Sequence, residues 1–441
     1  MTGGGLIVAA PKSGSGKTLI TAGLLRHLRD RGITVAAAKV GPDYVDPTFH
    51  ALASNAPCRN LDPWAMRPAT LAGLVRDLES AAEFVLCEGV MGLFDGTGPE
   101  GEAGSTAELA QIAGWPVVLV VDADGQGASV AALVAGFARH DPRVPLAGVV
   151  LNRVASLRHH ALLTDAIERH LPGIPVLGAM LRDKSLTLQA RHLGLIPAAE
   201  TCDAEALIAR TATRVAAALD VDRLIALARP SRCTSRPDVL GLSPLGQNIA
   251  IANDDSSLFS YDTMLSGWRR QGATISFFSP LADQAPSPGA DAIYLPGGYP
   301  ELHAGKLAAA TRFLGGLRSA ATRGTAIYGE CGGYMLLGDA LTDARGETHR
   351  MAGLLPVATS FAEPRRHLGY RTATLLATGP LGAARTSFRG HEFHYATIVE
   401  EGDADRLFSV ADARGNDLGQ AGLRRGTAAG SFIHLIDRVD E

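Results

Sequence analysis

The sequence predicts an α/β fold with two domains, each a mostly parallel sheet with helices on both faces. First, short apolar runs alternate with amphipathic helical patterns along the 441 residues, which is typical of repeated strand–helix units. Second, the apolar runs are continuous rather than alternating, as expected of strands buried on both faces. Third, residues 228–246 contain three prolines with several serines and arginines, a composition typical of a domain boundary.

The expected elements follow in two series. In the first series we expect strands at residues 6–10, 35–39, 84–87, 117–121 and 146–151, with helices at 19–29 and 70–78. In the second series we expect strands at residues 248–252, 274–278, 292–295 and 326–328. The predicted domains are therefore residues 1–229 and 248–441, joined by a linker at residues 230–247.

The composition argues against several classes of protein. Lys and Arg number 41 against 45 Asp and Glu, the net charge is −4, and aromatic residues make up only 5%. A surface for nucleic acid is therefore not expected. The five cysteines are widely spaced and form no CxxC pair, which indicates a reducing compartment and argues against disulfides or a zinc knuckle. No apolar run reaches the length of a signal peptide or a membrane span, so we expect a cytoplasmic protein that binds no membrane.

A glycine-rich loop, PKSGSGKT, follows the first expected strand and opens a helical pattern. Glycines allow backbone N–H groups to turn inward around phosphate oxygens, Lys17 can bridge the β- and γ-phosphates, and the Thr18 hydroxyl can bind Mg²⁺. The loop is a variant, because Pro11 stands where the pattern usually has Gly. Lys12 occupies a position at which some variant loops carry a lysine that acts across a dimer, so a homodimer is left open.

Carboxylates follow two further expected strands, in the segments KVGPDYVDPTFH (Asp43 and Asp46) and LCEGVMGLFDG (Glu88). Loops that follow parallel strands meet at one edge of the sheet, where carboxylate oxygens near Thr18 can bind Mg²⁺. Asn152 ends another expected strand, and its amide can read an adenine edge because it offers both a donor and an acceptor. The predicted nucleotide-binding residues are Ser13, Gly14, Ser15, Gly16, Lys17, Thr18 and Asn152.

A cysteine in a sharp turn marks the second half. The segment YGECGGYMLLG combines a strand, Cys331 and a helical pattern, which is the arrangement of a nucleophile elbow. The flanking glycines leave room for a substrate carbonyl, and backbone N–H groups can stabilise an oxyanion there. Gly332, together with Gly298 of the segment LPGGYPE, is the expected source of these donors.

A catalytic thiol also needs a base. His434, in the C-terminal segment GSFIHLID, ends an apolar run and is the candidate. His391 and His394 of the segment GHEFHY compete for the same role.

Together these motifs resemble known families. The second half resembles a class I glutamine amidotransferase domain of the branch found in cobalamin biosynthesis, through LPGGYPE, YGECGGYMLLG, GHEFHY and GSFIHLID; this implies a flavodoxin-like fold. The first half resembles the dethiobiotin-synthetase-like ATP-binding domain, a P-loop NTPase-like fold, through PKSGSGKT and CEGVMGLFDG. Their pairing, with KVGPDYVDPTFH between the two motifs of the first half, covers nearly the whole chain and resembles the cobyrinic acid a,c-diamide synthase family.

The resemblance implies an ATP-dependent carbon–nitrogen ligase. Cys331 would attack the side-chain amide of glutamine and release ammonia, with His434 handling the protons. ATP would transfer its γ-phosphoryl group to a substrate carboxylate, and ammonia would displace phosphate from the acyl phosphate. The implied Mg²⁺ ligands are Thr18, Asp43 and Glu88. The implied contacts near the reacting carboxylate are Lys39, Tyr44, Asp46 and Asp95.

Several alternatives stay open. The implied substrate is a corrin-type macrocycle, which would be amidated at its a and c side chains. This ring would have cobalt bound (cobyrinic acid) or be metal-free (hydrogenobyrinic acid). A nickel-sirohydrochlorin a,c-diamide synthase and a cobyric acid synthase are the nearest alternatives. More distant ones are an ATPase switch of the partitioning type, which would not explain Cys331 with His434, and a glutaminase-like hydrolase.

The third member of a catalytic triad is also open. Class I domains commonly carry Glu two residues after the catalytic His. Here that position is Ile436, and Asp437 comes one residue later. We therefore predict a Cys331–His434 dyad.

Overall fold

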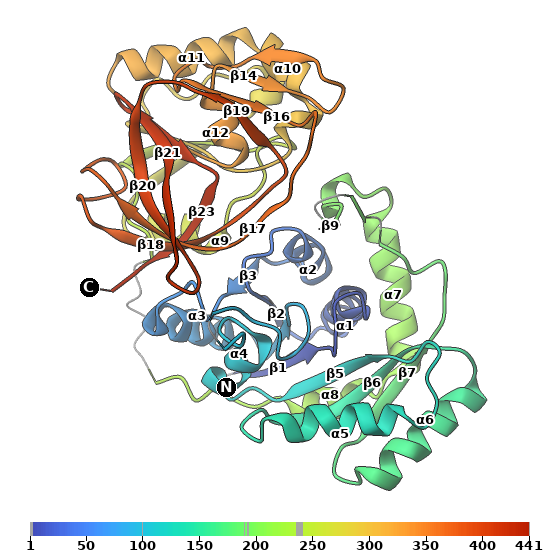
Figure 1. Cartoon of the computed structure of the whole chain (residues 1–441). Helices are drawn as coiled ribbons and strands as arrows, with labels where there is room; N and C mark the ends of the chain where they lie inside the picture. The colour runs from blue at the N-terminus through green and yellow to red at the C-terminus, as the bar shows by residue number, and fades with distance from the viewer. Residues whose placement is uncertain (1–2, 99, 189, 192–193, 235–240, 441) are drawn as a thin grey trace. The chain divides into compact units, whose positions relative to one another are not determined.

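The structure is a computed structural model and describes residues 3–98, 100–188, 190–191, 194–234 and 241–440. It divides into two compact units (Figure 1). The first comprises Met1–Trp64 and Pro68–Val239, and the second comprises Ala65–Arg67 and Leu240–Glu441. Part of the expected linker, residues 235–240, lies outside the described residues. The predicted α/β class with two domains is confirmed.

The first unit contains a seven-stranded sheet in the order β3-β2-β4-β1-β5-β6-β7, in which every pairing is parallel. Five strands lie where the apolar runs predicted them. The strand β3 was missed because Arg59 and Asn60 interrupt its apolar run, and β7 was also missed. The strands are β1 (Gly4–Ala9), β2 (Val35–Val40), β3 (Cys58–Leu61), β4 (Phe84–Glu88), β5 (Val117–Asp122), β6 (Leu146–Val154) and β7 (Val176–Leu181); a separate small hairpin pairs β8 (Ala190–Arg191) with β9 (Gly194–Leu195).

Helices cover both faces of this sheet. The helices α1, α2 and α7 lie on one face, and α3, α4, α5 and α6 lie on the other (Figure 1), as right-handed crossovers between parallel strands require. Their bounds are α1 (Lys17–Asp30), α2 (Asp46–Ser54), α3 (Pro68–Ala81), α4 (Thr106–Ala113), α5 (Val130–His140), α6 (Leu157–His170), α7 (Ala204–Ala218) and α8 (Val221–Leu227).

Strand register brings the chemistry-bearing residues of this unit together. In β4, Glu88 pairs with Val8 of β1 on one side and with Lys39 of β2 on the other. Because all three strands are parallel, the loops that follow them leave the sheet at the same edge. The phosphate loop and both carboxylate segments are therefore neighbours, although they are far apart in the sequence.

The second unit contains a ten-stranded sheet in the order β11-β10-β12-β13-β22-β21-β20-β17-β18-β23. The strands from β11 to β22 pair in parallel, whereas the remaining pairings are antiparallel. The expectation of a mostly parallel sheet is therefore correct for the first unit and wrong for half of this one. The antiparallel strands were missed because many of their residues are exposed or partly exposed, as in β17 and β20, so that they do not form continuous apolar runs.

The predicted strands of this unit all occur, and additional elements surround them. The strands are β10 (Asn248–Ala252), β11 (Thr274–Phe278), β12 (Ala292–Leu295), β13 (Ala326–Glu330), β14 (Ala340–Thr342), β15 (Thr348–Arg350), β16 (Val357–Ser360), β17 (His367–Leu375), β18 (Ser387–His394), β19 (Thr397–Glu401), β20 (Asp405–Asp412), β21 (Asp417–Arg425), β22 (Ala428–Ser431) and β23 (Ile433–Arg438). The helices are α9 (Asp262–Arg270), α10 (Ala304–Ala309), α11 (Thr311–Thr322) and α12 (Gly332–Leu337). The strands β15, β14, β16 and β19 form a separate four-stranded sheet.

Among the described residues, no helix is both long and apolar enough to cross a membrane.

Candidate active sites

The phosphate loop connects β1 to α1 and is held from behind. Gly14 and Gly16 have φ values of +76° and +94°, which only glycine adopts without strain. Ser15 is buried and its hydroxyl donates to the carbonyl of Lys12 at 2.9 Å. The side-chain amide of Asn152 donates to the carbonyl of Ser15 at 2.8 Å. One hydrogen bond within the loop and one from Asn152 therefore hold the loop in a turn that suits a phosphate chain.

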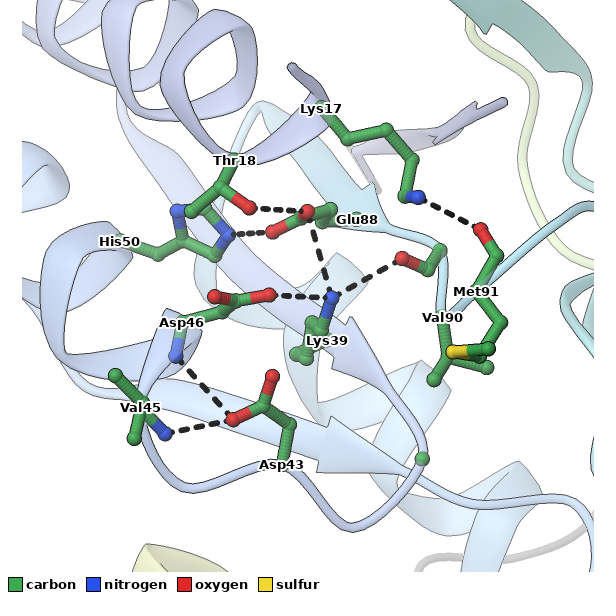
Figure 2. Close-up of polar contacts among 12 residues, drawn as sticks. Lys17, Thr18, Lys39, Asp43, Val45, Asp46, His50, Glu88, Val90 and Met91 are labelled. Carbon is green, nitrogen blue, oxygen red and sulfur yellow. Dashed lines mark hydrogen bonds and ion pairs between the residues drawn. The ribbon is translucent and has the colours of Figure 1, made fainter. Parts of the chain in front are cut away.

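Lys17 and Thr18 begin α1 and extend toward the strand ends (Figure 2). The ammonium of Lys17 donates to the carbonyl of Met91 at 2.7 Å. Burial lowers the pKa of Lys17, and the charge of Glu88 opposes this shift. The Thr18 hydroxyl donates to Oε1 of Glu88 at 2.8 Å.

Glu88 is the centre of the polar contacts in Figure 2. It is 1% exposed, and besides Thr18 it contacts Lys39 Nζ at 3.4 Å and Nε2 of His50 at 2.5 Å. Burial alone would raise the pKa of this carboxyl, but the charge of Lys39 and the contact with His50 outweigh burial and lower the pKa to about 2. Glu88 is therefore an ionised carboxylate although it lies in the interior.

Lys39 links this carboxylate to the next loop. Its ammonium contacts Oδ2 of Asp46 at 2.8 Å and donates to the carbonyl of Gly89 at 3.0 Å. Burial opposes its charge, but Asp46 and Glu88 raise its pKa. Asp43 lies farther along the same loop and accepts from the backbone N–H of Val45 at 2.7 Å. Burial, followed by the charge of Asp46, raises the pKa of Asp43 to about 7.

These residues surround a cavity of about 670 Å³. The predicted site residues that line it are Ser13, Gly14, Gly16, Lys17, Thr18, Lys39, Asp43, Asp46, Glu88 and Asn152. The other three, Ser15, Tyr44 and Asp95, are not among the lining residues. Asp95 is exposed and accepts from the N–H of Gly92 at 2.8 Å. The volume suits a nucleotide, and the oxygens of Thr18, Asp43 and Glu88 are donors that Mg²⁺ prefers.

His50 was not predicted as a site residue. It closes the segment KVGPDYVDPTFH, is completely buried, and contacts Glu88 from α2. Its position four residues after Asp46, on a helix that follows a strand end, places both side chains on one helical face. That spacing was the available signal.

In the second unit, Cys331 connects β13 to α12 with φ 49° and ψ −105°. A positive φ in a residue with a Cβ is strained and is frequent at catalytic nucleophiles. The side chain is 4% exposed. Burial raises the pKa of the Cys331 thiol, and the nearby charge of Glu301 raises it further. The thiol is therefore protonated before a substrate arrives.

Gly297 shows how closely the thiol and the imidazole approach each other. A Cβ built on Gly297 would lie 3.3 Å from the Cβ of Cys331, 3.3 Å from Nε2 of His434 and 2.5 Å from its Cε1. His434 is 1% exposed, and burial lowers its pKa well below the usual value. The structure thus brings Cys331 and a neutral His434 to one small space, which is vacant only because residue 297 lacks a side chain.

The two expected oxyanion donors are also neighbours. A Cβ built on Gly332 would lie 3.0 Å from the backbone nitrogen of Gly298. A Cβ on Gly298 itself would lie 2.2 Å from the carbonyl of Ser256. A side chain at Gly298 would clash with this carbonyl, and one at Gly332 would press against the backbone of Gly298. The two backbones therefore approach each other beside Cys331.

The competing histidines have partners of their own. His391 pairs with His434 across β18 and β23, and their rings stack with centroids 4.9 Å apart. Nδ1 of His391 lies 3.3 Å from the hydroxyl of Tyr261. His394 contacts the carbonyl of Ala396 and Oε1 of Glu392, both at 2.9 Å. This arrangement favours His434 as the base.

Comparison with known proteins identifies the family of each unit. Residues 248–440 match the family described as the CobB/CobQ-like glutamine amidotransferase domain, and residues 6–196 match the CobQ/CobB/MinD/ParA nucleotide binding domain. Hydrogenobyrinate a,c-diamide synthase from Brucella anthropi is 52% identical over 99% of both chains. The chain belongs to the hydrogenobyrinate a,c-diamide synthase family. Proteins of the same name from Sinorhizobium sp (52% identical over 98% of both chains) and Mesorhizobium japonicum (50% over the full length of both) extend the similarity. The predicted resemblance is confirmed.

Proposed function

We propose that this protein uses ATP and glutamine to amidate the a and c carboxylates of hydrogenobyrinic acid in cobalamin biosynthesis. The observation that carries the proposal is the presence of two separate clusters of candidate site residues in one chain. One joins a phosphate loop to Glu88, and the other joins Cys331 to His434. The relatives are named hydrogenobyrinate a,c-diamide synthase, and the similarity covers nearly the whole length of both chains.

The first unit would activate the carboxylate. A carboxylate does not react with ammonia until its oxygen becomes a leaving group, and transfer of the γ-phosphoryl group of ATP provides one. Lys17 would contact the transferred phosphoryl group. Thr18, Asp43 and Glu88 would hold Mg²⁺, which neutralises phosphate charge when bound. The proposed contacts with the reacting carboxylate are Lys39, Tyr44, Asp46 and Asp95.

The second unit would supply ammonia. The sulfur of Cys331 would attack the side-chain amide of glutamine while His434 accepts the thiol proton and passes it to the departing nitrogen. The backbone N–H groups of Gly298 and Gly332 would stabilise the oxyanion. Water then hydrolyses the glutamyl thioester, and the released ammonia displaces phosphate from the acyl phosphate.

The proposal also covers the partners of the protein. They would be small molecules in the cytoplasm: the ring, glutamine, ATP and Mg²⁺. The homodimer suggested by Lys12 is part of the proposal and can be measured by sedimentation. The names of the relatives favour the metal-free ring over the cobalt and nickel rings.

The test is a mass assay. The protein is incubated with ATP, Mg²⁺ and glutamine, in parallel with hydrogenobyrinic acid, cobyrinic acid and nickel sirohydrochlorin. Two successive small mass decreases of the metal-free ring, each from replacement of OH by NH₂, are expected. Reaction of only another ring would transfer the proposal to that ring, and more than two amidations would indicate a cobyric acid synthase. Glutamine hydrolysis without amidation of any ring would contradict the ligase function.

A further inference from the structure

The imidazole of His434 has two ring nitrogens with different surroundings. A Cβ built on Gly297 would lie 3.3 Å from Nε2 and also 3.3 Å from the Cβ of Cys331, so Nε2 is the ring nitrogen on the side of Gly297 and Cys331. In cysteine–histidine sites the second nitrogen commonly faces an acid that orients the ring. Ile436 cannot act as this acid. Asp437 contacts Arg67 instead, accepting from its backbone N–H at 3.0 Å and from its guanidinium at 3.0 and 3.1 Å.

A different carboxylate lies beside Nδ1 of His434. Oε2 of Glu330 is 3.9 Å from this nitrogen, and both side chains are 2% exposed or less. Glu330 is the last residue of β13 and directly precedes Cys331. Oε1 accepts from the backbone N–H of Leu435 at 3.1 Å, and Oε2 accepts from the hydroxyl of Tyr294 at 2.8 Å. The carboxylate of Glu330 therefore belongs to the residue directly before Cys331, and it is hydrogen-bonded to Leu435, the residue directly after His434.

We propose that Glu330 is the positioning residue of the glutamine site, taking the place of the acid that is missing after His434. This inference rests on the proposed function. As the Cys331 S–H bond breaks, its proton moves to Nε2 of His434 and the sulfur electron pair forms the bond to the amide carbon. The imidazole then carries a positive charge, and the carboxylate beside Nδ1 stabilises that charge.

The surroundings of Glu330 predict when it is ionised. Burial raises its pKa to about 7, and hydrogen bonds from the N–H of Leu435 and from Tyr294 oppose the increase. Glutamine turnover should therefore increase as the pH rises through the neutral range. The titratable groups that face this region are Tyr294 and Tyr328 beside Glu330, His434, His391 and His394 across the site, and Glu301 and Glu392 near Cys331.

The first experiment compares Glu330→Gln with the unaltered protein from pH 5 to 9. Glutamine can accept from Leu435 and donate to the oxygen of Tyr294, so the contacts that join the strands are conserved while the charge is lost. We expect kcat for glutamine hydrolysis to fall by about 10- to 100-fold, less than the roughly 10⁴-fold loss at a directly bonded acid. The increase with pH should also disappear. Ammonia-dependent amidation should be unchanged.

Two further variants separate positioning from structure. Tyr294→Phe removes a hydrogen bond that stabilises the ionised carboxylate, so the pH-dependent increase should move to higher pH. Asp343→Asn removes another buried carboxylate of this unit, outside the glutamine site, and should leave the profile unchanged. An unaltered kcat and pH profile in Glu330→Gln would overturn the proposal and leave Glu330 a purely structural role.

A second measurement does not depend on the ring substrate. A diazoketone analogue of glutamine alkylates a catalytic cysteine, and the rate of labelling of Cys331 can be followed by mass spectrometry. We expect Glu330→Gln to slow this reaction and to remove its pH dependence. If the unaltered protein is labelled but amidates no ring, the proposed function fails while this inference survives. Equal labelling of both proteins at every pH would overturn the inference alone.

Discussion

The two sites of this molecule bury their titratable groups to the same extent but reach opposite states of charge. In the first unit, Glu88 is 1% exposed and ionised, because Lys39 and His50 contact it directly. In the second unit, Cys331 and His434 are 4% and 1% exposed and neutral. Burial penalises the charged form in both places, so the difference comes from the partners.

This difference matches the chemistry that we propose for each site. Phosphoryl transfer needs fixed charges that exist before the substrate arrives, since charges that are already oriented cost no reorganisation free energy during the reaction. Attack by a thiol needs charges that appear only during the reaction, because a permanently ionised pair would be solvated or trapped in an ion pair. A buried group with counter-charges serves the first purpose, and a buried group with few counter-charges serves the second.

The largest effect is expected from removal of the nucleophile. Cys331→Ala should reduce glutamine-dependent amidation by at least about 10³-fold, because no other group can form the thioester. Amidation with ammonium at high pH should remain, since the charged site of the first unit is intact. Product mass with each nitrogen source measures both. Loss of the two activities together would show that the sites are not separate in function.

The next effect comes from removal of a counter-charge. Lys39→Met leaves the buried carboxylate of Glu88 and the partly buried carboxylate of Asp46 without their shared cation. Breaking such a buried pair costs about 3–5 kcal/mol, so the melting temperature should fall and amidation with both nitrogen sources should be lost. Glu88→Gln should likewise impair amidation with both nitrogen sources. Lys306→Met, at an exposed helical position, is the control and should change neither. Normal ammonia-dependent activity in Lys39→Met would contradict the role of fixed charge in the first site.

A smaller effect is expected where geometry alone is changed. Gly297→Ala places a methyl group 2.5 Å from the imidazole of His434, which forces the ring away from the thiol. A displacement of about 1 Å can cost 10²-fold in rate, so glutamine hydrolysis should decrease by about that factor while ammonia-dependent activity stays. Gly315→Ala, where a Cβ meets nothing within 4 Å, is the matched control. Full glutamine activity in Gly297→Ala would refute the close approach of the two side chains.

The smallest effect is in the pH dependence of stability. The pKa of Glu330 is raised from 4.5 to about 7, so its contribution is present below pH 4.5 and is lost as the pH rises to about 7. The pKa of Glu88 is lowered from 4.5 to about 2, so its contribution is present above pH 4.5 and is lost as the pH falls to about 2. The plot of melting temperature against pH should therefore become flatter between pH 4.5 and about 7 in Glu330→Gln, and flatter between pH 4.5 and about 2 in Glu88→Gln. Flattening of the same part by both variants would contradict the assigned states.

The predictions from sequence succeeded where the pattern is local. Continuous apolar runs identified most of the parallel strands, although β3, β7 and β22 were missed. The phosphate loop was recognised from consecutive residues. The turn at Cys331 was predicted from its flanking glycines, and the structure has it there with a positive φ. The antiparallel strands of the second unit were missed, because half-exposed strands have no continuous apolar run.

The side chains that contact the site residues were harder to predict from the sequence. Asp95 was proposed beside the reacting carboxylate on the basis of its segment. In the structure it is exposed and accepts from the backbone N–H of Gly92, and its role stays a prediction. His50 and Glu330 lie within the predicted motifs but were not predicted as site residues. Each acquires its role through a neighbour that is distant in the sequence, Glu88 in one case and His434 in the other.

Residue order was therefore sufficient for the α/β class, the family and the identity of the nucleophile, because these depend on patterns that span a few residues. Protonation states and the acid that faces His434 required the packed structure. A pKa depends on burial and on charges a few ångströms away, and strand register brings those charges from β2, α2, β13 and β23. Nothing within a single motif specifies that register.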